Sequence, residues 1–285
     1  MTTAALTGLN VYPVKSCRGI AVARARIGVR GLMLDAPASR VGDREWMIVD
    51  GGGRFITQRE LPQLALVDIA VTRDALRFAM RGMSSIDVPL AGPRSTPREV
   101  IVWQSSVPAH DEGPAVAAWL TAALGTEARL VRFDKTHERR CNPEFAGDSG
   151  AHTAFADGYP LLLAGEASLA DLNARLAAKA CGTLPMNRFR PNIVLAGLPA
   201  YDEDHLDTVE IDGIVVKLVK PCTRCITTTT DQATAIRGVE PLPTLAVYRY
   251  HDALGGVTFG MNAIVTAGAG SEIAVGSAVR CTYRF

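Results

Sequence analysis

The feature that most constrains this fold is a repeated pattern of short apolar runs separated by tight turns. Residues 209–211 and 214–219 flank Asp212-Gly213, a dipeptide typical of two-residue β-hairpin turns because both turn positions need a positive φ. Alternating apolar and polar residues over 21–27 have the period of a strand with one buried face. Similar signals predict further strands at residues 45–49, 54–57, 64–71, 76–80, 100–103, 192–195, 244–248, 257–265 and 273–279.

Two segments interrupt the β pattern with helical spacing. Residues 116–124 carry apolar side chains three and four positions apart and stop at Gly125. Residues 169–176 do the same, with Ser168 and Asp171 resembling a capping box and Gly182 as the expected end. The polar stretch 134–157 lacks periodicity and is expected to be a long loop. The chain is therefore predicted to be mainly β with a few helices (α+β), and its first half to form a sheet closing toward a barrel.

Composition excludes several classes of protein. The chain of 285 residues is 48% apolar and 21% charged, which is typical of a soluble globular protein. Its net charge of +1 provides no overall field to attract nucleic acid. No apolar run approaches the roughly 20 residues of a membrane span, and the first nine residues lack signal-peptide features. A cytoplasmic location, no membrane partner and six reduced cysteines are expected.

The sharpest motif surrounds a pair of cysteines at 220–230. Cys222 and Cys225 flank Arg224, a setting that stabilises a thiolate able to act as a nucleophile or a soft-metal ligand. Structural zinc is disfavoured because no second pair of ligands follows at suitable spacing. A thioredoxin-type dithiol is also disfavoured, since four consecutive threonines after Cys225 favour a strand. Both thiols could still be ordinary buried residues.

Two further segments could hold an anion. Lys15 and Ser16 stand where a strand gives way to a loop, and both side chains can donate to a phosphate. Residues 187–192 place two arginines and two asparagines ahead of a buried strand. Either segment could equally be a solvated loop. The five histidines show no ligand spacing, although His152 lies in the long loop, and no ATP or dinucleotide motif occurs.

These segments, in this order, resemble the MOSC family over essentially the whole chain. The resemblance is carried by 11–17 (VYPVKSC), 166–173 (EASLADLN), 189–194 (FRPNIV), 222–225 (CTRC) and 240–242 (EPL). It implies a MOSC N-terminal β-barrel-like module at 1–125 and a MOSC domain with a β-barrel core at 126–285. Within the family, the chain looks most like amidoxime-reducing components and bacterial reductases of N-hydroxylated bases.

The resemblance implies a molybdenum cofactor, with Cys225 as the metal ligand and catalytic thiolate and Cys222 beside it. It also implies two-electron reduction of an N–O bond in a small N-oxygenated substrate. The implied cofactor-binding residues are Lys15, Ser16, Arg44, Arg190, Asn192, Thr223, Arg224, Cys225 and Asn262, with Gly158 and Tyr159 as weaker candidates.

Two departures from the family pattern matter. A ferredoxin-like cysteine cluster found in some relatives is missing, so no iron-sulfur cluster is expected and a separate ferredoxin-like, flavin or cytochrome partner should supply electrons. Asp231-Gln232 replaces a common Asp-Pro. A persulfide-based carrier of sulfur or of the cofactor remains an alternative function, as does an anion-binding protein without a metal.

Overall fold

The computed structural model describes residues 2–37, 39–91, 95 and 97–284. Within these residues the chain is mainly β, as predicted, and is built around a closed seven-stranded barrel. The strand order is β15-β16-β1-β22-β17-β18-β20, and pairing of β20 with β15 closes the barrel. These strands are β1 (Thr2–Val11), β15 (Leu161–Gly165), β16 (Ile193–Ala196), β17 (Leu206–Ile211), β18 (Ile214–Thr223), β20 (Gly256–Ala267) and β22 (Ala278–Tyr283).

The barrel interior is filled by the apolar half of each alternating strand. Leu6, Leu163, Ile193 and Val216 have no exposed surface and belong to one apolar cluster. The predicted hairpin joins β17 to β18, and Asp212 and Gly213 have φ values of 50° and 79°. Because β1 is a barrel strand, the start of the chain packs among strands that follow residue 160. The predicted division at residue 125 stays a prediction.

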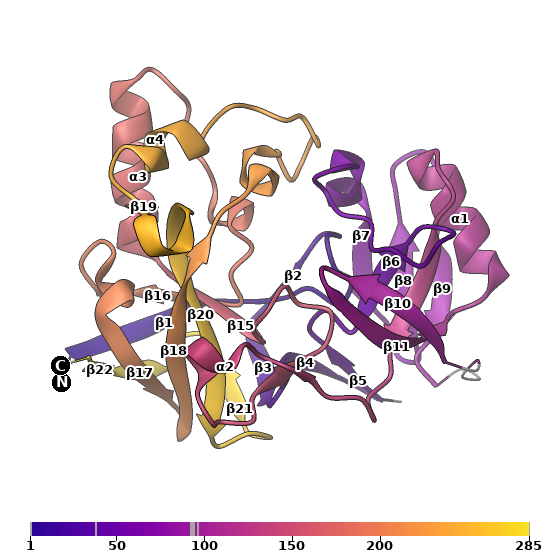
Figure 1. Ribbon diagram of the computed structural model, residues 1–285, viewed down its shortest axis with the longest axis horizontal. Helices are drawn as coiled ribbons and strands as arrows, with labels where there is room; N and C mark the ends of the chain where they lie inside the picture. Colours follow the sequence, from indigo (N-terminus) through magenta and orange to yellow (C-terminus); the bar gives the residue numbers. More distant parts are fainter. Residues whose placement is uncertain (1, 38, 92–94, 96, 285) are drawn as a thin grey trace.

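A second lobe is formed largely by residues 43–138 and packs around two further apolar clusters. Figure 1 shows this lobe, with α1 (Pro114–Leu124), on the opposite side of the molecule from the barrel and from the helices α3 (Glu166–Ala178) and α4 (Leu242–Ala246). One of its sheets has the strand order β10 (Arg98–Val102), β11 (Ser105–Asp111), β12 (Arg129–Phe133), β6 (Trp46–Val49). The other has the order β7 (Asp68–Val71), β8 (Ala75–Ala79), β9 (Ile86–Pro89).

A smaller sheet lies between the two lobes (Figure 1). It contains β21 (Glu272–Ala274), β3 (Arg24–Gly28), β4 (Gly31–Ala36) and β5 (Ser39–Gly42), while β2 (Ile20–Val22) pairs with β1. The remaining elements are β13 (Arg139–Arg140), β14 (His152–Thr153), β19 (Tyr250–His251), α2 (Pro143–Ala146), α3 (Glu166–Ala178), α4 (Leu242–Ala246), and the 3-10 turns η1 (Pro62–Leu66), η2 (Met186–Arg188), η3 (Asp202–His205), η4 (Ile226–Thr229) and η5 (Asp252–Leu254). In the described residues, no helix combines the length and apolarity needed to cross a membrane.

Two strand predictions were wrong because local hydrogen bonds favoured a helical turn, and a third was right only in part. Residues 244–248 fall mainly in α4, where the Glu240 carboxylate accepts bonds from the Thr244 amide (3.1 Å) and hydroxyl (2.8 Å). The threonines after Cys225 form η4, since the Thr228 and Thr229 hydroxyls donate to carbonyls three residues earlier at 2.9 and 2.8 Å. Residues 64–71 divide into the end of η1 and strand β7.

The two predicted helices exist, but both ends of the second differ from the prediction. Gly125 ends α1 in the left-handed conformation (φ 69°), as predicted. In α3 the N-cap is Gly165. Ser168 lies inside the helix, and its hydroxyl donates to the buried Glu203 carboxylate at 2.7 Å instead of capping the helix. That helix ends before Lys179 rather than at Gly182. The predicted long loop at 134–157 contains β13, α2 and β14.

Candidate functional site

A cleft at the junction of the barrel and the second lobe gathers every predicted cofactor-binding residue. These residues come from the loop after β1, the turn before β6, the segment after β14, the loop before β16, the end of β18 and strand β20. The predicted residues lining the cleft are Lys15, Ser16, Arg44, Gly158, Tyr159, Arg190, Asn192, Thr223, Arg224, Cys225 and Asn262. Cys222 also lines it, whereas His152 lies in β14 with its ring 3.2 Å from the Gly150 carbonyl.

The electrostatics of the cleft are dominated by cations. Five of its lining residues are basic (Lys15, Arg44, Arg59, Arg190 and Arg224), and Asp157 is the acidic one among the described lining residues. The protein is nearly neutral overall, so this charge is a local feature built by the fold. The cleft is therefore suited to an anionic ligand.

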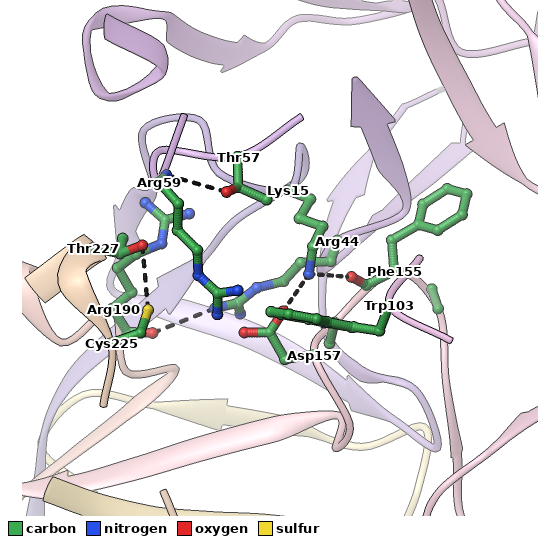
Figure 2. Close-up of polar contacts among 12 residues, drawn as sticks. Lys15, Arg44, Thr57, Arg59, Trp103, Phe155, Asp157, Arg190, Cys225 and Thr227 are labelled. Carbon is green, nitrogen blue, oxygen red and sulfur yellow. Dashed lines mark hydrogen bonds and ion pairs between the residues drawn. The ribbon is translucent and has the colours of Figure 1, made fainter. Parts of the chain in front are cut away.

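Lys15 and Asp157 form an ion pair at the cleft surface (Figure 2). The Lys15 amine is almost buried and also donates to the Phe155 carbonyl at 2.9 Å. Burial lowers the pKa of this amine below its ordinary value, although Asp157 opposes the shift. Desolvation by the surrounding cleft walls opposes ionisation of Asp157, but the Lys15 amine and the Trp103 N–H outweigh it and hold its pKa below the ordinary value. Asp157 thus remains an anion, with 72% of its side chain exposed in the cleft.

Two guanidinium groups pack against the same tyrosine ring. The Cζ atoms of Arg44 and Arg190 each lie 4.3 Å from the centroid of Tyr12. Arg44 is neutralised by an ion pair with buried Asp43. No ion pair joins Arg190 to a carboxylate in the described part of the chain, and burial lowers its pKa to about 10. Arg190 is therefore an under-compensated buried cation.

Asn192 has a positioning role that the sequence did not reveal. Its amide oxygen accepts from the Leu162 amide and from Arg44, both at 3.1 Å. Its amide nitrogen donates to the Asn10 carbonyl (3.1 Å) and to Asp43 (2.9 Å). These four contacts use the hydrogen-bonding capacity of the side chain. Asn192 thus fixes Arg44 relative to the barrel.

The two cysteines of the motif have different surroundings. Cys225 Sγ lies 3.4 Å from the Thr227 hydroxyl (Figure 2). Burial raises the pKa of the Cys225 thiol, but hydrogen bonds from Thr227 and the Arg59 guanidinium outweigh it, so the pKa lies below its ordinary value. Cys222 Sγ instead contacts Arg224 Nη1 at 2.9 Å. Cys225 is consequently the thiol favoured as a thiolate.

Backbone strain is concentrated around the cleft. Ser16, Arg44, Trp103 and Arg190 all line it, and all have positive φ values between 49° and 68° despite bearing side chains. Such conformations cost on the order of 1 kcal/mol or more each and persist where the surrounding structure enforces them. This strain is typical of functional sites.

Several cleft residues were missed from the sequence: Thr57, Arg59, Trp103, Asp157 and Thr227. Thr57 takes part in a local contact that was not predicted from the sequence, since its hydroxyl donates to Glu60 at 2.6 Å. Asp157 and Thr227 sat within segments interpreted as a loop and a strand. The one available signal was Trp103, a large aromatic residue at the end of the strand predicted at 100–103.

The unusual Gln232 forms a buried bridge between the lobes. Its side chain exchanges two hydrogen bonds with Gln58, at 2.9 and 3.1 Å, and neither side chain is more than 6% exposed. Gln58 also donates to the Ser16 carbonyl at 2.6 Å, and Arg190 Nη1 lies 3.5 Å from Gln232 Oε1. The pair therefore supports two residues of the cleft.

We expect Gln232→Ala to lower the free energy of unfolding by about 1–3 kcal/mol, because it leaves the buried Gln58 carbonyl oxygen without a donor. Urea unfolding followed by circular dichroism measures this. Gln104→Ala, at an exposed turn, serves as the control and should change stability by less than about 0.5 kcal/mol. Equal effects of the two substitutions would contradict a supporting role for the amide pair.

Comparison with known proteins gives consistent matches along the chain. Residues 3–127 match the MOSC N-terminal beta barrel domain and residues 150–280 match the MOSC domain. Mitochondrial amidoxime reducing component 2 of Bos taurus is 36% identical over 249 residues, which cover 86% of this chain and 72% of that protein. The Rattus norvegicus protein of the same name is 37% identical (85% and 71% covered), and mitochondrial amidoxime-reducing component 1 of Homo sapiens is 35% identical (86% and 72%).

Proposed function

This chain belongs to the MOSC family, and we propose that it is a molybdenum-cofactor-dependent oxidoreductase that reduces N-oxygenated small molecules with electrons from a separate protein. The observation that carries the proposal is the convergence in one cleft of a thiol with a lowered pKa, Cys225, and five basic side chains. The names of the relatives supply the class of reaction, because an amidoxime carries an N–O bond.

The residues present fit such a cofactor. Arg190 Nη2, Arg224 Nε and the Tyr159 hydroxyl are buried without a hydrogen-bond partner in the described structure, and all three residues line the cleft. Unpaired buried donors are costly, so they favour a ligand rich in acceptor oxygens and nitrogens, such as a pterin phosphate. Among the described residues, no three or more His, Cys, Asp or Glu side chains are grouped so that they could hold a metal ion. We therefore propose Cys225 as a single protein ligand, with the cofactor supplying the others.

We assign the contacts as follows. Cys225 would ligate the metal, and Lys15, Ser16, Arg44 and Arg190 would hold the phosphate and pterin. Thr223, Arg224 and Asn262 would complete the pocket, with Asn192 fixing Arg44. When bound, the cofactor would supply a metal that delivers two electrons to the substrate N–O bond. The chain itself would orient the substrate and stabilise the Cys225 sulfur through Thr227 and Arg59.

The electron source is proposed to be a separate carrier protein. The six cysteines are free thiols dispersed over both lobes, and Cys17, Cys141 and Cys281 are buried in the packing. Of the six, Cys222 and Cys225 are the ones that line the cleft. The two thiols near the proposed metal are therefore assigned to the molybdenum site and its surroundings rather than to an iron-sulfur cluster.

The direct test is reduction of benzamidoxime by cofactor-loaded protein, with reduced methyl viologen as an artificial donor. Benzamidine should appear with two electrons consumed per molecule. Protein containing close to one molybdenum per chain that reduces no N-oxygenated compound would overturn the proposed reaction while leaving the cofactor site intact.

Asp157 is the group we expect to hold the N–H groups of the substrate. Its carboxylate is exposed in the cleft and stays ionised, so it can accept hydrogen bonds from an amidine N–H. Asp157→Asn should lower kcat/KM for benzamidoxime about 10- to 100-fold with molybdenum content unchanged. Because the Asp157 pKa is lowered, wild-type kcat/KM should show no loss from this group until the pH falls below the ordinary aspartate range. Asp148→Asn, on an exposed loop, is the control, and a matching loss there would remove Asp157 from the site.

A further inference from the structure

Trp103 occupies a position where its residue type is costly. It forms, with Gln104, the two-residue turn between β10 and β11, where Val102 pairs with Ser105. Its φ of 57° lies in the left-handed region, which Asn and Gly adopt easily and an aromatic residue does not. Because the turn conformation disfavours tryptophan, the presence of this residue is explained by where its indole lies and not by the needs of the turn.

Three contacts fix the indole in the cleft, where Figure 2 shows it beside Asp157. Its Nε1 donates to Asp157 at 3.0 Å, which links the tip of a second-lobe hairpin to the segment before the barrel strand β15. The Phe55 ring lies 5.0 Å away between centroids, at 55°. The Arg59 guanidinium carbon lies 4.2 Å from the indole centroid. The ring is thus held by its edge, with one face covered by a planar cation.

The position of Arg59 shows what this face can bind. Its guanidinium stacks on Trp103 and reaches the Cys225 sulfur, and no ion pair joins it to a carboxylate in the described residues. A guanidinium and the core of an N-hydroxyamidine are both planar, delocalised and rich in N–H donors. The Arg59 side chain is long and rotates readily, so it can leave the face to a substrate.

We propose that Trp103 is a specificity-determining residue: its indole face stacks on the planar amidine-like core of the substrate, and Asp157 at its edge accepts the substrate N–H. This inference rests on the proposed function for the identity of the substrate. The indole face then selects planar, delocalised N-oxygenated compounds over saturated amine derivatives, which lack a flat face to stack.

The test compares Trp103→Ala and Trp103→Phe with Trp119→Phe, which alters a tryptophan of α1 outside the cleft lining. In cofactor-loaded protein, binding of benzamidinium and of cyclohexylammonium, two cations of equal charge but different shape, is measured by calorimetry. Wild type and Trp119→Phe should prefer benzamidinium about tenfold or more, Trp103→Ala should lose that preference, and Trp103→Phe should keep most of it. An unchanged preference in Trp103→Ala would overturn the proposal.

Kinetics separate this inference from the proposed function. With benzamidoxime, Trp103→Ala should raise KM about tenfold and change kcat less than about threefold, since stacking acts on binding. If Trp103→Ala turns over benzamidoxime with the KM of wild type, the role of Trp103 is rejected and the proposed function is unaffected. Absence of turnover in every variant, with the calorimetric preference still lost in Trp103→Ala, would reject the reaction and retain the binding face.

Discussion

Cys225→Ala is expected to lose molybdenum and reductase activity together, whereas Cys222→Ala should retain the metal. Cys225 is the thiol whose pKa is lowered, by Thr227 and Arg59 against the effect of burial, so it is the soft anionic donor available to a metal. Elemental analysis of protein from a cofactor-competent host should give close to one molybdenum per chain in wild type and below about 0.1 in Cys225→Ala. Activity should fall at least about 100-fold, because losing a metal ligand costs at least as much as losing a residue that only orients one.

Cys222→Ala is the matched control for this measurement, because its thiol lines the same cleft but contacts Arg224. Metal retention in Cys225→Ala and loss in Cys222→Ala would reverse the assignment of the ligand. Absence of molybdenum from all three proteins would favour the alternative of a sulfur carrier. Mass spectrometry would then be expected to find one additional sulfur atom on Cys222 or Cys225.

Arg190→Met is expected to stabilise the cofactor-free protein while weakening its hold on the cofactor. Burial lowers the pKa of Arg190 to about 10, so the folded state disfavours its charged form. Because the folded-state pKa lies below the unfolded value, this cost is fully present at neutral pH and disappears as the pH rises from about 10 into the ordinary arginine range. Methionine removes the charge and keeps apolar contact with Tyr12, so unfolding should cost about 1–3 kcal/mol more.

The same substitution removes a donor from the proposed phosphate and pterin site, so cofactor release should be about 10- to 100-fold faster. Urea unfolding of protein from a cofactor-deficient host and the release rate of molybdopterin measure the two effects. Arg188→Met is the matched control: Arg188 is also buried, but it pairs with Asp231 at 2.8 Å and donates to the Thr229 carbonyl at 2.9 Å. Its loss should destabilise the protein by about 3 kcal/mol or more. Destabilisation of similar size in both variants would reject a ligand-directed role for Arg190.

Features governed by neighbouring residues were predictable from the sequence. The hairpin turn at Asp212-Gly213 and the glycine stop of α1 are such features, because positive φ is a local property of the turn residue. Strand alternation also identified most barrel strands, since one face of each strand is buried. The family resemblance then indicated the residues of the cleft. The strand predictions at 244–248 and in the threonine run failed because side-chain hydrogen bonds outweighed β propensity.

By itself the sequence determined a mainly β fold, the location of its tight turns and the motif that carries Cys225. Only the tertiary structure decided which distant residues meet around that thiol. Lys15 pairs with Asp157 across 142 positions, and Gln58 pairs with Gln232 across 174. Arg59 and Trp103 reach the cleft because the second lobe packs against the end of the barrel. Such contacts depend on how strands pair and lobes pack, which is set by the burial of the whole apolar core rather than by any local pattern.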